Sequence, residues 1–396
     1  MLKIIVLLCF IILSLTYSRS SFDENDKEFL QSTLKQILLN KSDLPNSIKI
    51  SNENYEINYH INTELEENIK KLFKRYHPDY GAMVIIDNNS GNIISAVDFQ
   101  RKTKSFGREL CFSNNHPAAS VFKVITAADL LENTEISSES TFTYRGSSST
   151  LYKYQLKDKV DRWTRELKLE KAFASSNNVV FGKAAINKSN GKQLYAMANK
   201  FKFNQELLDE LKLEESLFQM PEDAYNLAEL ASGFNRGTVM SPLHGAVIAS
   251  IVANDGVYKK PSLISSIKDD KGNTVWHPIK QTEEVLKTSS SKELQNMMEL
   301  TIEKGTARSL GKYAKRPPLS NLVLGGKTGS ITGGEPHGKR DWFIVYAKPK
   351  QQELGRGISV AVMLVNVDKW YVKSTWLAKN VIEYYYQNLF PLREKL

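Results

Sequence analysis

The sequence contains only two cysteines in 396 residues, Cys9 and Cys111. Two cysteines cannot build a disulfide scaffold, and a chain of this length buries a large core without one. Long blocks of like charge and basic stripes interleaved with aromatic residues are also missing, although the formal net charge is +9. We therefore interpret the excess of basic residues as a solvated surface and expect no nucleic-acid partner.

Motifs for metal and nucleotide chemistry are absent as well. The six histidines form no His-Glu-x-x-His pair and no cluster with cysteine at zinc spacing. No Gly-x-x-x-x-Gly-Lys-[Ser/Thr] loop and no Gly-x-Gly-x-x-Gly fingerprint occurs. We therefore expect no metal site and no cofactor.

Long apolar runs are missing except near the start of the sequence. Lys3 precedes an apolar run over 4–15, and polar residues follow up to residue 20. This order is typical of a secretory signal, and the run is shorter than the roughly 20 apolar residues of a membrane span. We interpret 1–20 as a signal peptide or an uncleaved N-terminal anchor, with membrane anchoring through 4–15 left open. Either way, we expect an exported protein, in the periplasm or on the outer face of the cytoplasmic membrane.

The rest of the sequence reads as a short N-terminal extension over 21–57 and one large domain over 58–396. Apolar patterns predict two early strands, a helical middle and three late strands, which we expect to form one antiparallel sheet. The expected elements are a helix over 63–76, a hairpin over 81–98, a helix over 118–131, strands over 322–324, 342–347 and 358–365, and a helix over 376–389.

A Ser-x-x-Lys pattern, Ser120 to Lys123, opens the expected helix over 118–131, which is apolar on nearly every face. Residues three apart share a helix face, so the amine lies beside the hydroxyl. Serine needs an adjacent base at neutral pH, and burial favours the neutral lysine that can act as one. The pattern alone is unspecific, because it also occurs at Ser32/Lys35, Ser189/Lys192, Ser265/Lys268, Ser289/Lys292 and Ser309/Lys312.

Two further motifs follow in the chain. The first is Ser-x-Asn, which fits Ser176 with Asn178 or Ser175 with Asn177, and we prefer the former because of its alignment with Phe181. The second is Lys-Thr-Gly-Ser over 327–330, in which a cation and two hydroxyls follow small residues on an expected strand. Small residues at that position let a ligand backbone approach a strand edge.

These three motifs in this order resemble those of the serine penicillin-recognising enzymes, the penicillin-binding proteins and their β-lactamase relatives. One departure is the start of the nucleophile helix, which reads Pro117-Ala118-Ala119-Ser120 where the family usually has Pro-Gly-Ser. The resemblance covers about residues 60–390. It implies an α+β fold of the β-lactamase/transpeptidase type, with an antiparallel five-stranded sheet flanked by helices and an all-helical subdomain.

The resemblance also implies catalytic roles. Ser120 is the acylated nucleophile and Lys123 its general base. Ser176 relays a proton to the leaving amine, and Asn178 holds the substrate amide and the lysine. Lys327 biases the lysine–serine site electrostatically.

The substrate-binding residues implied in the same way are Thr328, Gly329 and Ser330. Thr328 and Ser330 bind a substrate carboxylate, and the backbone N–H groups of Ser120 and Ser330 form the oxyanion hole. The expected partners are peptidoglycan stem peptides and β-lactam antibiotics.

The reaction that we expect is D-Ala-D-Ala transpeptidation through an acyl-enzyme on Ser120, which cross-links peptidoglycan and is inhibited by β-lactams. Residues 21–57 are too few for a glycosyltransferase domain, so we expect any such activity to come from a partner. A D,D-carboxypeptidase or endopeptidase, a serine β-lactamase and a non-catalytic penicillin sensor are the alternatives. Against a β-lactamase, the nearest match to the deacylating Glu-x-x-Leu-Asn loop, over 222–226, lacks the leucine.

Overall fold

The computed structural model describes residues 24–40, 43–50, 53–351 and 355–392. The expected signal peptide or anchor over 1–20 lies outside these ranges. Within them, no helix combines the length and the apolar character that crossing a membrane requires.

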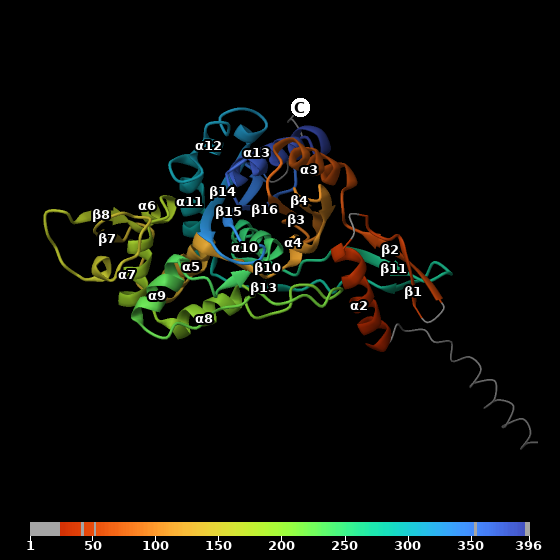
Figure 1. Cartoon of the computed structure of the whole chain (residues 1–396), viewed down its shortest axis with the longest axis horizontal. Coiled ribbons are helices and arrows are strands. Elements are labelled where there is room, and N and C mark those ends of the chain that lie inside the picture. Colours follow the sequence, from red (N-terminus) through yellow and green to blue (C-terminus); the bar gives the residue numbers. More distant parts are fainter. Residues whose placement is uncertain (1–23, 41–42, 51–52, 352–354, 393–396) are drawn as a thin grey trace, which may run out of the picture.

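A central antiparallel sheet organises the fold (Figure 1). Five of its strands are those that the sequence predicts, and they come from both ends of the chain. A short strand, β5, extends the expected five-stranded sheet to six. The order across the sheet is β14 (Leu322–Thr332), β15 (Lys339–Pro349), β16 (Ile358–Asn366), β3 (Tyr80–Asp87), β4 (Ile93–Gln100) and β5 (Ser105–Gly107).

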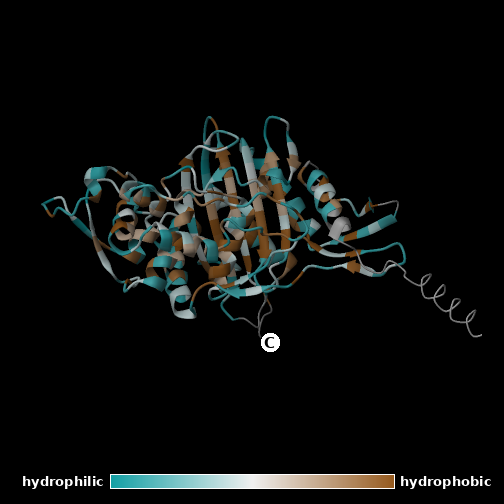
Figure 2. Ribbon diagram, turned by 90° about the horizontal axis from the view of Figure 1, so that it is seen from below, coloured by the Kyte–Doolittle hydropathy of each residue, from teal (hydrophilic) through white to brown (hydrophobic). Residues whose placement is uncertain are grey.

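Both faces of the sheet are covered by helices, which explains why its strands are apolar runs rather than alternating ones (Figure 2). On β15, Trp342 and Ile344 belong to one core, while Phe343 and Val345 belong to the other. The first core includes α10 (Pro242–Ala253), in which every residue is buried. The second includes α3 (Thr63–Tyr76) and α13 (Ser374–Tyr384).

A mostly helical subdomain lies beside the β14 edge of the sheet (Figure 1). It also carries a small hairpin, so it is not entirely helical. Its elements are α5 (Lys123–Asn133), β7 (Thr141–Tyr144), β8 (Arg165–Lys168), α6 (Leu169–Ala174), α7 (Asn178–Lys188), α8 (Gly191–Lys200), α9 (Ala224–Ser232) and α11 (Thr288–Glu303).

The N-terminal extension is tied to the middle of the chain by a second, four-stranded sheet of order β1-β2-β11-β12. Strand β2 crosses the boundary expected between residues 57 and 58, and its residues Glu56 to Tyr59 pair with β11. The residues before β1 form a helix. The elements are α2 (Glu24–Asn40), β1 (Ser47–Ile50), β2 (Glu53–Tyr59), β11 (Ile264–Lys268) and β12 (Thr274–Trp276).

The remaining elements are short. They connect the sheet to its covering helices and pair the segment before the nucleophile with the start of α10. They comprise α4 (Glu109–Phe112), β6 (His116–Pro117), β9 (Val239–Met240), β10 (Val257–Lys259), β13 (Thr282–Glu284) and α12 (Arg308–Gly311), with a π-helical turn at Tyr385–Leu389 that continues α13.

Candidate active site

Ser120 lies in a 3₁₀ turn, Ala119–Phe122, and α5 begins only at Lys123. The sequence predicts one continuous helix here, and the structure divides it. The reason is the backbone at Ala119, whose φ of 51° lies in the left-handed region that alanine rarely adopts. The serine hydroxyl consequently lies at the end of the helix, on the surface of a cavity, while Lys123 is fully buried below it.

Gly233, the left-handed C-cap of α9, makes the close packing of this turn possible. Its φ is 65°, and a Cβ atom placed on it would lie 1.9 Å from the carbonyl oxygen of Ala119. Only glycine fits that position without displacing the backbone next to the nucleophile. The preceding residue, Ser232, accepts a hydrogen bond from the Lys123 amine through its carbonyl.

The Lys123 amine has three polar neighbours. Its Nζ lies 2.9 Å from Ser120 Oγ, 2.7 Å from Asn178 Oδ1 and 2.5 Å from the carbonyl oxygen of Ser232. The amide oxygen and the carbonyl can only accept, whereas the hydroxyl can also donate. A protonated amine can donate to all three oxygens, whereas a neutral amine can donate to Asn178 and Ser232 and accept the Ser120 proton with its lone pair.

The surroundings favour that neutral form. Burial lowers the pKa of Lys123 well below its ordinary value, and the charge of Lys327 lowers it further. Burial also lowers the pKa of Lys327, to about 7. The rings of Phe181 and Phe173 lie 5.7 Å and 5.5 Å from these two amines and help to exclude water from them.

The Ser-x-Asn motif lies at the turn between α6 and α7, where Ser176 has a left-handed φ of 57°. Its Oγ lies 3.0 Å from Lys327 Nζ. The Asn178 amide is oriented by different partners at its two ends, since Nδ2 donates to the carbonyl of Ser149 over 2.9 Å and Oδ1 accepts from Lys123. The structure therefore brings Ser176 and Asn178 to the two lysines.

Ser175 and Asn177, the alternative Ser-x-Asn pair, make other contacts. Ser175 Oγ bonds the carbonyl of Lys171 one helical turn earlier, as a C-terminal residue of α6. Asn177 is the N-cap of α7 and accepts from the N–H of Val180. Both interactions stabilise helix ends, and this arrangement supports the Ser176/Asn178 register.

Residues 327–330 lie on β14, at the edge of the central sheet. Lys327 points into the interior, whereas Thr328, Gly329 and Ser330 line a cavity of about 560 Å³ together with Ser120, Ser176 and Asn178. The structure thus gathers all eight predicted site residues at one cavity, with the two lysines buried beneath it.

Several residues that line this cavity carry no recognisable motif. Thr306 comes from the loop after α11, and its hydroxyl lies 2.5 Å from that of Thr328. Ser148 and Ser149 come from the loop after β7, and their carbonyls hold Asn178.

The far end of the cavity is charged. Asp341 lies directly across from Ser330 in the sheet, and burial raises its pKa to about 6. It accepts from the N–H of Ser374 over 2.8 Å. Lys373 lies next to it, with Nζ 3.1 Å from the ring centroid of Trp370. In the described part of the chain, Asp341 is the one acidic residue that lines this cavity.

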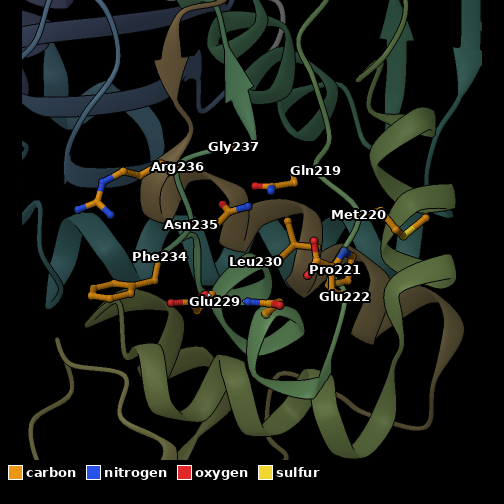
Figure 3. Close-up of a pocket in the computed structure, with 11 residues that line it drawn as sticks. Gln219, Met220, Pro221, Glu222, Glu229, Leu230, Phe234, Asn235, Arg236 and Gly237 are labelled. Carbon is orange, nitrogen blue, oxygen red and sulfur yellow. Dashed lines mark hydrogen bonds between the residues drawn. The ribbon is translucent and has the colours of Figure 1, made fainter.

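A second cavity, of about 530 Å³, lies on the other side of Phe234, which lines both (Figure 3). Its acidic residues are Glu222 and Glu229. In Figure 3, Phe234 and Arg236 extend to the same side from the segment after α9, and Arg236 Nε donates to the carbonyl of Thr332 on β14. The glutamate of the 222–226 segment therefore lines the neighbouring cavity rather than that of Ser120.

In the described ranges, no group of three or more His, Cys, Asp or Glu side chains is arranged to hold a metal ion. The one described cysteine, Cys111, is buried, and burial raises the pKa of its thiol.

Comparison with known proteins identifies the family. The family model of the penicillin binding protein transpeptidase domain matches residues 81–382. The chain therefore belongs to the penicillin-binding protein transpeptidase domain family, as the three motifs predict.

Individual relatives are distant. The chain is 34% identical to penicillin-binding protein 1F of Bacillus subtilis over 30% of its own length and 16% of that protein. It is 25% identical to peptidoglycan D,D-transpeptidase PbpA of Mycolicibacterium smegmatis over 64% of its length and 50% of that protein. It thus spans half or less of these relatives.

Solved structures show the same fold. Penicillin-binding protein A from Mycobacterium tuberculosis, as its ceftriaxone acyl-enzyme complex, superposes with a TM-score of 0.63 at 20% identity, over 83% of this chain and 79% of that one. The α+β fold of the β-lactamase/transpeptidase type, with its large antiparallel sheet flanked by helices, is therefore confirmed.

Proposed function

We propose that the chain is a D,D-transpeptidase that cross-links peptidoglycan through an acyl-enzyme on Ser120, and that β-lactams acylate the same serine. The observation that carries this proposal is the contact between the buried Lys123 amine and Ser120 Oγ, 2.9 Å apart, at the surface of a cavity. Family membership and the peptidoglycan D,D-transpeptidase among the relatives support it.

In the first half-reaction, neutral Lys123 takes the Ser120 proton as Oγ attacks the penultimate D-Ala carbonyl of a stem peptide. The backbone N–H groups of Ser120 and Ser330 stabilise the oxyanion. The proton held by Lys123 is relayed through Ser176, which contacts Lys327, to the departing D-Ala amine, and Lys123 returns to its neutral form. Bond formation at Oγ and bond cleavage at nitrogen leave an ester on the enzyme.

In the second half-reaction, an amine of a neighbouring stem attacks that ester and loses a proton as the new amide forms, and this proton returns to Ser120 Oγ as the serine is released. The hydroxyls of Thr328 and Ser330 face the cavity where the terminal carboxylate would lie. Asn178 is oriented to hold both the substrate amide and Lys123. A Cβ atom on Gly329 would lie 3.2 Å from the side chains of Ala119 and Val121, so glycine here lets the strand pack closely against the turn that carries Ser120.

The environment of the acyl-enzyme favours a long lifetime with β-lactams. A β-lactamase needs a base that activates water against the ester, and Glu222 lines the neighbouring cavity instead. Asp341, the acid in the Ser120 cavity, accepts the N–H of Ser374 and lies beside Lys373. This favours a penicillin-binding protein over a β-lactamase.

We infer further that the protein acts outside the cytoplasmic membrane, with 1–20 as signal peptide or anchor, 21–57 as extension and 58–396 as the catalytic domain. The polymer that it acts on lies there.

A direct experiment incubates the full-length protein with a peptide ending in D-Ala-D-Ala and an acceptor amine, and follows the products by chromatography. A new amide that is absent with Ser120→Ala supports the transpeptidase. Release of D-Ala with the shortened free acid as the only other product indicates a carboxypeptidase. No release of D-Ala by a protein that still binds penicillin indicates a sensor.

A further inference from the structure

The loop between β7 and β8, with the first residue of β8 (residues 145–165), projects from the end of the molecule opposite α2 (Figure 1). We call these residues the 145–165 arm. Thirteen large hydrophobic side chains are exposed in the described ranges, and four of them lie within 152–163. Such a concentration on a surface marks an interaction site rather than chance exposure.

The arm is rigid despite its exposure. The buried Gln155 side chain donates to the carbonyls of Arg145 and Ser147 and accepts from the N–H of Tyr152. Arg145 also forms an ion pair with Asp161 across the arm, at 3.0 Å. A surface held in this way loses little conformational entropy when it binds.

Three aromatic residues of the arm are exposed, Tyr152, Tyr154 and Trp163, and we call them the aromatic platform. The rings of Tyr152 and Tyr154 are stacked, with centroids 5.9 Å apart and planes within 11° of parallel. More than half of each side chain is exposed, and Trp163 is 67% exposed. Flat aromatic faces bind the apolar faces of sugar rings, while the hydroxyl and N–H edges keep hydrogen bonds to polar groups.

The arm is also positively charged. It contains six basic and two acidic residues, a net charge of +4 (6 − 2). Both acids are paired, Asp158 with Lys183 and Asp161 with Arg145. The uncompensated cations attract a ligand that carries carboxylates. They are Lys153, Lys157, Lys159, Arg162 and Arg165.

The arm continues directly into the Ser120 cavity. Ser148 and Ser149 lie on the arm, line that cavity and bond Asn178 through their carbonyls. The hydroxyl of Tyr225, on α9, also bonds the carbonyl of Leu151 over 2.7 Å. A polymer lying along the arm would therefore present its side branches to Ser120.

We propose that the 145–165 arm binds the glycan strand of peptidoglycan, with the aromatic platform on sugar rings and the basic residues on the carboxylates that this polymer carries. The proposal rests on the proposed function for the identity of the polymer. A membrane surface also attracts aromatic and basic side chains. The direct passage from the arm into the cavity favours the glycan strand, because its peptide branches are what Ser120 must reach.

The test measures binding of the full-length protein to intact, insoluble peptidoglycan by co-sedimentation, and to the soluble glycan strands that remain after enzymatic removal of the stem peptides by affinity electrophoresis. We expect the wild type to bind, and the Tyr152→Ser/Tyr154→Ser/Trp163→Ser variant to bind at least about tenfold more weakly. Phe29→Ser, at an exposed aromatic residue on α2, is the matched control and should bind like the wild type.

Additional variants and ligands separate the possible outcomes. Lys153→Gln/Lys157→Gln/Lys159→Gln should weaken binding and reduce its salt dependence. Equal binding by the triple aromatic variant, loss of wild-type binding when the peptides are removed, or tighter binding to phosphatidylglycerol vesicles would each overturn the proposal. Benzylpenicillin acylation, measured on the same samples, should be equal in all variants. Absence of acylation in the wild type would contradict the proposed function, whereas the glycan-binding result could still be interpreted.

Discussion

The amine of Lys123 on α5 lies 2.7 Å from the side-chain oxygen of Asn178 on α7, and Ser120 Oγ lies on the other side of the same amine. The contact positions the base and keeps it neutral, because an amide oxygen accepts a hydrogen bond without adding a full negative charge. Replacing Asn178 with the nearly isosteric aspartate would therefore place a negative charge beside the amine and favour its protonated form.

Asn178→Asp should abolish most acylation at neutral pH. A carboxylate at 2.7 Å raises the pKa of Lys123 and protonates it, so the amine cannot accept the Ser120 proton. We expect the acylation rate by a chromogenic β-lactam to fall at least about tenfold at pH 7 and to recover partly as the pH rises. Asn177→Asp is the charge-matched control, since aspartate caps a helix as well as asparagine. Equal loss in both variants would contradict this account.

Lys327→Met tests the coupling of the two lysines. The charge of Lys327 lowers the pKa of Lys123, so removing it should raise that pKa. In a pH–rate profile, the acylation rate falls at low pH, where Lys123 becomes protonated. The pH at which the rate falls should be higher in the variant. A pH–rate profile from single-turnover acylation measures it. An unshifted profile would show that burial alone sets the pKa.

The Ser-x-Asn register can be tested by comparing neighbours. Ser176→Ala removes the hydroxyl 3.0 Å from Lys327 and should slow transpeptidation at least about tenfold. Ser175→Ala removes a hydroxyl that bonds only carbonyls of α6, those of Lys171 and Ala172, and should leave turnover within about twofold of the wild type. The reverse result would assign the motif to Ser175 and Asn177.

Gly233→Ala should disturb the turn that carries Ser120, although Gly233 is far from that turn in the sequence. The new Cβ would lie 1.9 Å from the Ala119 carbonyl oxygen, and the left-handed φ adds strain of about 1–2 kcal/mol. Gly272→Ala is a matched control, because Gly272 also has a left-handed φ, of 83°, but no heavy atom lies within 4 Å of its added Cβ. Thermal unfolding should show a small loss for Gly272→Ala and a larger one, with impaired acylation, for Gly233→Ala. Similar losses would show that backbone strain dominates.

Asp341 makes stability depend on pH. Burial raises its pKa from 3.8 to about 6, so the folded state holds the proton more tightly than the unfolded state. Its contribution is therefore present below the unfolded value and lost as the pH rises to about 6, by up to about 3 kcal/mol. Asp341→Asn should have wild-type stability near pH 4 and exceed it at pH 7, as chemical denaturation at both pH values would show. A pH-independent difference would contradict the raised pKa.

Much of the fold follows from the sequence because the central strands are uninterrupted apolar runs and α3 has a clear amphipathic period. The expected helix over 63–76 has the same bounds as α3. The division of the nucleophile helix could not be predicted, because it depends on the left-handed backbone of Ala119 packed against Gly233, more than a hundred positions away. Helical periodicity contains no information on such a contact.

The site was predictable where residues close in sequence share a task, as Ser120 and Lys123 do. It was not predictable where single residues from separate loops meet. Thr306 reaches Thr328 only because the loop after α11 passes β14, and Ser149 reaches Asn178 only through the fold of the arm. Isolated threonines and serines carry no signal of such placement.

The most direct test of the central claim is intact-protein mass spectrometry of the full-length protein mixed with benzylpenicillin and followed over hours, beside Ser120→Ala. We expect a persistent adduct with the added mass of one penicillin, located at Ser120 and absent in the variant. An adduct that disappears quickly while the drug is hydrolysed would indicate a β-lactamase. The absence of any adduct, or an adduct that survives in Ser120→Ala, would contradict the assignment of Ser120 as the nucleophile.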